Sequence, residues 1–143
     1  MIRRAVADDI PRLVEMARDS YAQTPMAVFP FSAERTAEYM GALMSEANSC
    51  IYMSKGATIG TAIVCSPFSL APIVTEEFWY ADKSVKDARG AMALLAQVEK
   101  WAAQRQAAAV FMKTVNVPGQ ERVAKLYQRR GYIPLENTYM RVL

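Results

Sequence analysis

The sequence of 143 residues contains no histidine. Histidine is the commonest general base and the commonest metal ligand, so its absence excludes Ser–His and Cys–His hydrolases and argues strongly against a zinc hydrolase. The two cysteines, Cys50 and Cys65, are too few and too isolated for a disulfide framework or a metal site. We expect both cysteines to be buried thiols. We also expect no bound metal, and any acid–base chemistry must come from carboxylates, tyrosine, cysteine, lysine or water.

Long hydrophobic runs are also missing, and none reaches the roughly 18 residues that a transmembrane helix needs. The first four residues, Met-Ile-Arg-Arg, lead into acidic residues rather than an apolar segment, so we expect no signal peptide. Hydrophobic residues make up 52% of the chain and charged residues 22%, which is normal for a globular protein. We therefore expect a cytoplasmic protein with a single domain over residues 1–143 and no membrane partner.

Charge is modest and unevenly distributed. The chain has 17 basic and 14 acidic residues, a net charge of +3, and the basic excess lies in residues 72–143. A basic half suits an anionic ligand such as a pyrophosphate. Because the basic residues are not clustered, we expect no nucleic-acid partner.

Hydrophobic periodicity predicts an α/β (α+β) fold, with a mixed, mostly antiparallel central sheet flanked by about four helices. The predicted order is β-α-α-β-β-β-α-β-α-β-β, without repeats or a linker. The expected helices cover residues 8–21, 32–46, 88–104 and 119–130. The expected strands cover residues 2–6, 49–54, 57–66, 73–81, 109–115, 132–135 and 139–142.

The most informative segment is residues 122–132, which has the pattern of a helix that ends at a glycine and leads into a strand. Val123, Leu126 and Tyr127 recur at i, i+3 and i+4 and form one apolar face. Gly131 is the residue type that ends helices in the left-handed conformation. An aromatic residue on such a face usually packs in a core, which is the alternative to any functional role of Tyr127.

This segment resembles the C-terminal helix and strand of the GNAT superfamily of acyl-CoA-dependent N-acyltransferases. There a Leu-Tyr pair precedes Gly-Tyr or Gly-Phe in the same register, and the tyrosine protonates the departing CoA thiolate. The element order and the opening Ile-Arg-Arg-Ala…Asp-Asp-Ile-Pro-Arg-Leu extend the resemblance over almost the whole chain. It implies a GNAT-like fold, acetyl-CoA as cosubstrate, and Tyr127 as a catalytic and cofactor-binding residue. It is also compatible with a homodimer.

The turn before the third predicted helix has the chemistry of a pyrophosphate site, because a helix N-terminus directs backbone N–H groups toward an anion. By position it matches the GNAT phosphate loop, Arg/Gln-x-x-Gly-x-Gly/Ala. Arg89 departs from this pattern by replacing the middle glycine, and its guanidinium would either crowd the phosphate or pair with it. The variant hints at a phage-type relative. The predicted cofactor-binding residues here are Lys86, Asp87, Ala88, Arg89, Gly90 and Ala91.

Two consecutive glutamates interrupt the strand predicted over residues 73–81. A carboxylate in so hydrophobic a strand is energetically costly unless it is solvated or paired. Burial would also raise its pKa toward the neutral range that suits a general base. In GNAT enzymes the residue that deprotonates the amine, often through water, frequently lies on this strand. Glu76 lies ten residues before Lys86, close to the separation usual in the family, so we prefer it to Glu77. Either glutamate could equally be solvated or ion-paired. Period-2 alternation predicts Glu76, Phe78 and Tyr80 on one face and Glu77, Trp79 and Ala81 on the other.

The resemblance implies further cofactor contacts. The backbone of Trp79, Tyr80 and Ala81 would hydrogen-bond the pantetheine arm as an added strand does. Asn116 would either contact the cofactor or simply end a strand. The resemblance implies that the apolar loop over residues 22–31 lines the groove for a small-molecule or protein amine, and that Tyr21 or Tyr39 faces this groove.

Three interpretations of the function follow. The first is an N-acetyltransferase that moves an acetyl group from acetyl-CoA to a primary amine, with Glu76 as base and Tyr127 as acid. The second is an inactive GNAT-like domain that binds acyl-CoA or a macromolecule, with Arg89 blocking the phosphate position. The third, ranked well below, is an unrelated α+β module such as a ferredoxin-like binder.

Overall fold

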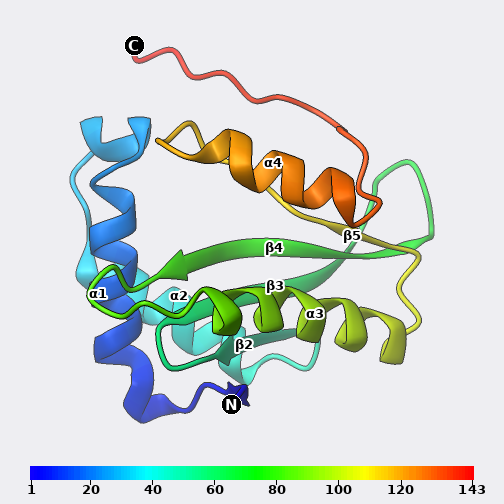
Figure 1. The fold of residues 1–143 in the computed structure, drawn as a ribbon, viewed down its shortest axis with the longest axis horizontal. Coiled ribbons are helices and arrows are strands. Elements are labelled where there is room, and N and C mark those ends of the chain that lie inside the picture. Colours follow the sequence, from blue (N-terminus) through cyan, green and yellow to red (C-terminus); the bar gives the residue numbers. More distant parts are fainter. The chain divides into compact units, whose positions relative to one another are not determined.

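The computed structural model of the chain describes residues 1–143 in two compact units, Met1–Lys113 and Thr114–Leu143. The elements, in chain order, can be followed in Figure 1. The first unit contains β1 (Arg3–Arg4), a 3₁₀ turn (Ala7–Asp9), α1 (Ile10–Tyr21), a second 3₁₀ turn (Pro25–Val28), α2 (Ala33–Ser45), β2 (Ser49–Met53), β3 (Ala57–Cys65), β4 (Pro72–Ala81), α3 (Ala88–Gln104) and β5 (Ala109–Phe111). The second unit contains α4 (Gln120–Arg129).

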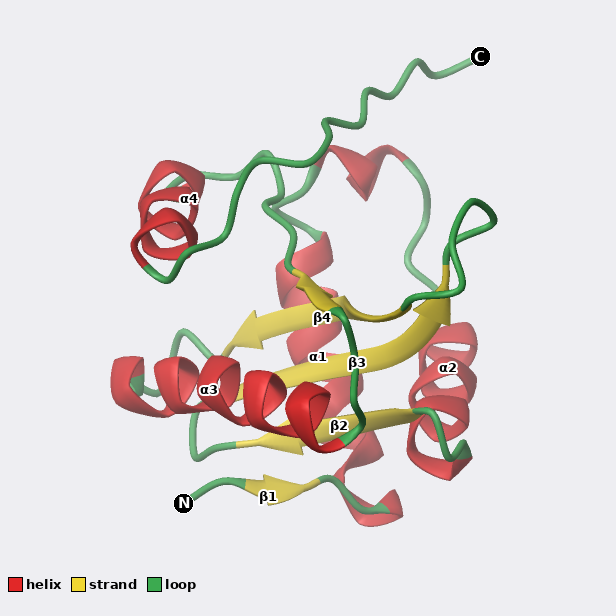
Figure 2. Ribbon diagram, turned by 90° about the vertical axis from the view of Figure 1, so that its right-hand side faces the viewer, coloured by secondary structure: helices red, strands yellow, loops and turns green.

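One five-stranded sheet organises the first unit, with the strands in the order β1-β2-β3-β4-β5. The first four strands are antiparallel, and β5 runs parallel to β4 after the crossover through α3. Figure 2 shows α3 on one face of the sheet and α1 and α2 on the other. The predicted mixed, mostly antiparallel sheet with four α-helices is therefore confirmed.

Each face of the sheet carries its own hydrophobic core. On the α3 face, Leu94, Val98 and Trp101 pack against sheet residues that include Ile59 and Val74. The core on the other face joins α1 and α2 to the sheet through Leu13, Ala17, Met40, Leu43, Ile51, Met53 and Phe78. Apolar residues at helical spacing on α1, α2 and α3 supply these contacts, as the sequence predicted.

Local side-chain chemistry sets the helix starts. The Ser32 hydroxyl accepts the Arg35 N–H at 3.1 Å and caps α2. At α1, by contrast, the Asp9 carboxylate accepts hydrogen bonds from residues that precede it. These are the Val6 N–H at 2.8 Å and both terminal guanidinium nitrogens of Arg3 at 2.7 Å. Asp9 therefore ties β1 to α1 rather than capping the helix with its side chain.

A β-bulge interrupts β4 and overturns the predicted alternation of its faces. Gly60 pairs with Phe78 and Thr61 with Glu76, so Glu77 is the extra residue. Phe78 consequently belongs to the core under α1 and α2, together with the partly buried Tyr80. Glu76 instead lies opposite Thr61, whose hydroxyl contacts Cys50 of the other core. The grouping of Glu76 with Phe78 and Tyr80 was wrong, because one inserted residue shifts the period-2 pattern.

The second unit, residues 114–143, contains a single helix. Gly119 at φ +90° precedes α4, and Gly131 at φ +89° ends it. The Tyr132 N–H donates to the Tyr127 carbonyl at 3.0 Å, and the Gly131 N–H donates to the Gln128 carbonyl at 3.1 Å. This is the Schellman arrangement, which confirms the predicted helix end at Gly131.

The strands predicted over residues 132–135 and 139–142 are wrong, because this segment forms no ladder with any strand. Pro134 lacks a donor in the first of them, and β propensity alone cannot form a strand without a partner. Its large apolar side chains stay exposed, including Ile133, Leu135 and Tyr139. Two other strands are shorter than predicted, since β1 covers only Arg3–Arg4 and β5 ends at Phe111.

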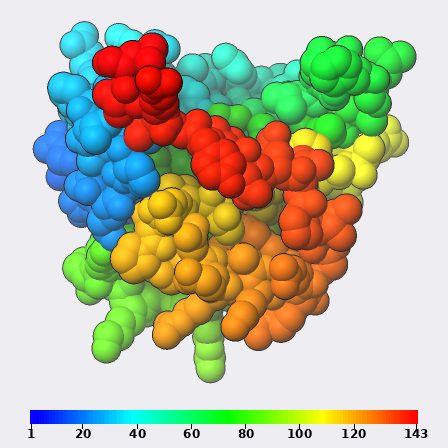
Figure 3. Space-filling model, turned by 90° about the horizontal axis from the view of Figure 1, so that it is seen from above, coloured from blue at the N-terminus to red at the C-terminus, as the bar shows by residue number.

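The two cysteines differ in exposure. Cys50 is buried, as predicted, but Cys65 is exposed, because it lies where β3 leaves the covered part of the sheet. The loop that follows, residues 66–71, projects at the upper right of Figure 3, and Phe68 and Leu70 are almost fully exposed. No helix of the chain has the length and apolar character required to cross a membrane.

Candidate functional site

The N-terminus of α3 is built around the Asp87 carboxylate. One of its oxygens accepts the Gly90 N–H at 2.9 Å and caps the helix. The other accepts the Ser54 hydroxyl at 2.8 Å and the Gly56 N–H at 2.9 Å. These hydrogen bonds, from Ser54 first and then Gly56, hold the pKa of Asp87 below its usual range. The cap therefore carries a negative charge at neutral pH and joins the β2–β3 turn to α3.

Two glycines make this arrangement sterically feasible. A Cβ at Gly90 would lie 2.1 Å from an Asp87 carboxylate oxygen, and a Cβ at Gly56 would lie 2.8 Å from the Asp87 Cβ. Gly90, which was predicted to bind the cofactor, thus makes room for a carboxylate of the chain itself. The N–H groups of Ala88 and Arg89 lie outside this cap, and the side chains of Lys86 and Arg89 are exposed beside it.

β5 pairs with only the first part of β4. β5 pairs with β4 only at residues 73–75, opposite residues 109–111. The part of β4 with Trp79, Tyr80 and Ala81 therefore has no β5 neighbour, although its other edge pairs with β3. Trp79 packs against the α3-side core, whereas Tyr80 packs on the opposite side. An extended ligand could add to this edge by backbone hydrogen bonds.

The bulge gives the two glutamates of β4 separate surroundings. Glu76 is only 6% exposed, and its Oε2 accepts the Lys113 N–H, just after β5, at 3.0 Å. Glu77 is partly buried, and its Oε2 accepts a short hydrogen bond from the hydroxyl of Tyr39 on α2. One carboxylate thus lies toward β5 and the other toward α2.

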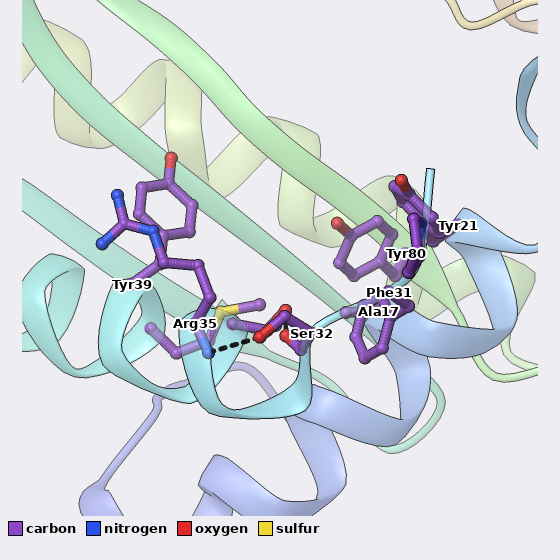
Figure 4. Close-up of a pocket in the computed structure, with 10 residues that line it drawn as sticks. Ala17, Tyr21, Phe31, Ser32, Arg35, Tyr39 and Tyr80 are labelled. Carbon is purple, nitrogen blue, oxygen red and sulfur yellow. Dashed lines mark hydrogen bonds between the residues drawn. The ribbon is translucent and has the colours of Figure 1, made fainter. Parts of the chain in front are cut away.

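A cavity of about 340 Å³ lies on the α1 and α2 side of the sheet. In the view of Figure 4, Tyr39 and Arg35 of α2 lie at one end and Tyr21 of α1 at the other, with Tyr80 and Phe31 between them. The residues lining the cavity are Ala17, Tyr21, Pro30, Phe31, Ser32, Arg35, Thr36, Tyr39, Met40 and Tyr80.

Two phenols of this cavity have perturbed ionisation. Burial and the hydrogen bond to Glu77 raise the pKa of Tyr39 far above its usual range. Burial, and then the charge of Glu76, raise the pKa of Tyr80. Both phenols therefore stay protonated at physiological pH, and both sense a nearby carboxylate.

The remaining predicted site residues, Asn116 and Tyr127, belong to the second unit. The Asn116 side-chain oxygen accepts a hydrogen bond from the Gln120 side chain at 3.1 Å, one turn ahead on α4. The Tyr127 ring lies 5.5 Å from the Tyr132 ring, centroid to centroid. Their roles toward a cofactor stay predictions.

The sequence did not indicate the positions of Arg35 and Ser54, whereas Tyr39 was expected to face a groove. Arg35 lies on α2, and the helical pattern does not show which of its polar side chains face a cavity. Ser54 belongs to a turn that meets Asp87 only in the folded chain. No group of three or more histidine, cysteine, aspartate or glutamate side chains lies close enough to hold a metal ion.

Comparison with solved structures identifies the fold. The chain resembles an aminoglycoside 6′-N-acetyltransferase from Acinetobacter haemolyticus, with a TM-score of 0.72 and 14% identity over 100% of this chain and 97% of the other. It resembles a Pyrococcus furiosus protein assigned as an acetyltransferase, with a TM-score of 0.74 and 19% identity over 100% and 99%. A transcriptional regulator from Bacillus halodurans gives a TM-score of 0.77 and 12% identity over 99% of each chain.

These structures define the class: the chain has the fold of the GNAT acetyltransferases, as the sequence resemblance implied. Identities of 12–19% support the fold and leave the activity to be argued from the site. No protein-family model matches the sequence, and no curated protein does.

Proposed function

We propose that the protein is an N-acetyltransferase that moves the acetyl group of acetyl-CoA to a primary amine. The observation that carries this proposal is that β4 continues beyond residue 75, where its pairing with β5 ends, and leads through a short loop to the N-terminus of α3. On this fold, such an edge suits the amide-bearing pantetheine arm, and the helix N-terminus suits the pyrophosphate. The solved acetyltransferases with the same fold support this assignment.

The reaction is a direct transfer. The amine nitrogen attacks the thioester carbonyl carbon, a C–N bond forms, and the C–S bond breaks with its electron pair leaving on sulfur. Glu76 takes up the proton that the amine loses, directly or through a water molecule. Backbone N–H groups of residues 79–81 stabilise the oxyanion, and Tyr127 gives a proton to the thiolate.

Cofactor binding is assigned to residues on both sides of the β4–α3 loop. The backbone of Trp79, Tyr80 and Ala81 holds the pantetheine arm, and the segment 86–91 holds the pyrophosphate. Lys86 and Arg89 supply positive charge there, which offsets the negative charge of the Asp87 cap. Asn116 of the second unit is a further cofactor contact in this proposal.

A second function is favoured by the Asp87 carboxylate itself. A negative charge at the N-cap of α3 opposes a bound phosphate, and Arg89 could occupy the phosphate position instead. The chain would then be a GNAT-like binding protein, as a transcriptional regulator with the same fold illustrates. Its partner would be a macromolecule, and the protein would not consume acetyl-CoA.

Calorimetric titration with acetyl-CoA separates the two functions. We expect micromolar binding to the native protein, lost on Arg89→Glu and retained on Lys100→Glu, which makes the same charge change at an exposed position of the same helix. Equal binding to both variants would remove the pyrophosphate from residues 86–91. No binding to the native protein would contradict the enzyme and support the binding protein.

A further inference from the structure

The second unit carries all of the net charge of the chain. Its two acidic residues are Glu121 and Glu136, and its five basic residues are Arg122, Lys125, Arg129, Arg130 and Arg141. Residues 1–113 contain twelve basic and twelve acidic residues, so the net charge of +3 belongs to residues 114–143. Such a concentration of positive charge in a short segment attracts a polyanion.

Three of these basic residues form a row along one side of α4. Arg122, Lys125 and Arg129 follow an i, i+3, i+7 spacing, which places them within about 60° of one another around the helix axis. Tyr127, which is buried, lies about 140° from Arg122 around the same axis. This basic row therefore lies on the side of α4 away from the buried tyrosine, and all three of its side chains are exposed.

The charges of the basic row are not neutralised within the protein. None of its three side chains forms an ion pair, and Glu121, the one acidic residue of α4, does not pair with Lys125 one turn ahead. The helix itself is fixed at both ends, by Gly119 before it and by the Schellman turn at Gly131. A polyanion can therefore bind the row without displacing a carboxylate or ordering the helix first.

We propose that the basic row of α4 binds the sugar–phosphate backbone of a nucleic acid. The row extends about 10 Å along the helix axis. Each strand of a duplex presents a phosphate about every 3.4 Å along its axis, so about three phosphates lie within this length. Three cations on α4 thus meet about three phosphates of one strand. The proposal does not rest on the proposed acetyl transfer.

A lipid surface matches the basic row less well than a nucleic acid does. Stable binding to a bilayer needs apolar side chains beside the basic ones, and α4 has no large apolar side chain that is exposed. The exposed apolar residues of the second unit follow Tyr132, whose ring packs against Tyr127 on the other side of the helix from the row. A phosphate backbone needs only the positive charges.

This inference revises the expectation of no nucleic-acid partner, which rested on basic residues that are not clustered along the chain. Residues three and four positions apart become neighbours on one face of a helix, so α4 gathers charges that the sequence separates. Contacts to the backbone alone carry no information about base sequence. We therefore expect binding that depends on salt and not on sequence.

The test is fluorescence anisotropy of the native protein with a labelled duplex DNA and, separately, a single-stranded RNA, over a series of salt concentrations. Three phosphate contacts predict that log K falls against log [salt] with a slope of about −2.7 for the duplex and about −2.1 for the single strand. Lys125→Gln should make the duplex slope shallower by about 0.9. Lys100→Gln, which removes the same charge from an exposed position of α3, should leave the slope unchanged.

Three results would overturn the proposal: no binding of either nucleic acid at low salt, a slope that Lys125→Gln leaves unchanged, or an equal effect of Lys100→Gln. Tighter binding to vesicles of phosphatidylcholine and phosphatidylglycerol than to either nucleic acid would also overturn it. Tighter binding of one nucleic acid would identify that one as the ligand. Glutamine is a good helix former, so both variants should fold, which circular dichroism checks. The titration contains no acetyl-CoA, so its result is independent of the proposed acetyl transfer.

Discussion

The Asp87 carboxylate and the Gly90 backbone are in such close contact that no side chain fits between them. The Gly90 N–H donates to this carboxylate at 2.9 Å, and a Cβ at position 90 would lie 2.1 Å from its Oδ2. The same carboxylate accepts hydrogen bonds from Ser54 and Gly56 of the β2–β3 turn. Gly90 therefore serves the junction between this turn and α3, whatever ligand the helix N-terminus binds.

Replacing Gly90 with alanine should destabilise the protein by about 1–3 kcal/mol, because the new methyl group displaces the Asp87 cap. Gly41, within α2, is the matched control, since nothing lies within 4 Å of a Cβ there. Gly41→Ala should raise stability by about 0.5–1 kcal/mol through helix propensity. Urea unfolding of the two variants measures both effects, and equal stability changes would contradict the Asp87–Gly90 contact.

The ion pair between Arg3 and Asp9 should make the first unit sensitive to acid. The hydrogen bond from Arg3 is the main cause that lowers the pKa of Asp9 to about 2 from 3.8. The folded protein thus binds this proton less readily than the unfolded chain, and the stabilisation is lost as pH falls from about 4 to about 2. Asp9→Asn should lower the free energy of unfolding by about 1 kcal/mol at pH 7 and reduce its dependence on pH between about 4 and about 2. Asp8→Asn, at the exposed neighbour, should leave the curve unchanged.

Substitutions of the two β4 carboxylates, Glu76 and Glu77, should have different effects on the steady-state rate constants. If Glu76 is the base, Glu76→Gln lowers kcat by about 10²–10⁴-fold, while the amide oxygen of the variant side chain can still accept the Lys113 N–H. Glu77→Gln should change kcat far less, because Glu77 lies toward Tyr39 on the other side of the sheet. Steady-state rates with acetyl-CoA and a series of primary amines measure both effects. The reverse pattern would identify Glu77 as the base.

Tyr127→Phe should lower kcat by about 10²-fold, with little change in the KM for acetyl-CoA, because it removes the proton donor for the thiolate and keeps the ring. Tyr132→Phe is the control, since its ring packs against Tyr127 but has no proposed chemical role. A Tyr127→Phe variant with native kcat would mean that Tyr127 serves only packing.

The parts of the fold that were predictable depend on neighbours in the chain. The helices followed from periodic apolar residues and, for α4, from the end signal at Gly131, which acts within one turn. The strands at the two ends of the chain were predicted less well. A strand exists only where a partner lies beside it, and no local pattern announced that residues 132–143 have none.

The candidate site shows the same limit. The sequence indicated Glu76 and Glu77 because two carboxylates interrupt a hydrophobic strand. It indicated segment 86–91 because small and basic residues lie at a predicted helix N-terminus. It could not indicate the bulge, which depends on how Gly60 of β3 meets Phe78 of β4: a Cβ at Gly60 would lie 2.4 Å from the Phe78 ring. The resemblance implied a groove at the loop 22–31 with Tyr21 or Tyr39, and both tyrosines line the cavity, but the part that Tyr80 of β4 plays in it could not be predicted.

The bulge at Glu77 has a consequence for how this protein can change over evolution. Two adjacent codons specify carboxylates on opposite sides of one sheet, one beside Lys113 and one beside Tyr39. A substitution at position 77 can therefore alter the surface beside Tyr39 while the other carboxylate keeps its surroundings. Loss of a single residue here would restore the regular pleat and leave one carboxylate, which could face only one side of the sheet.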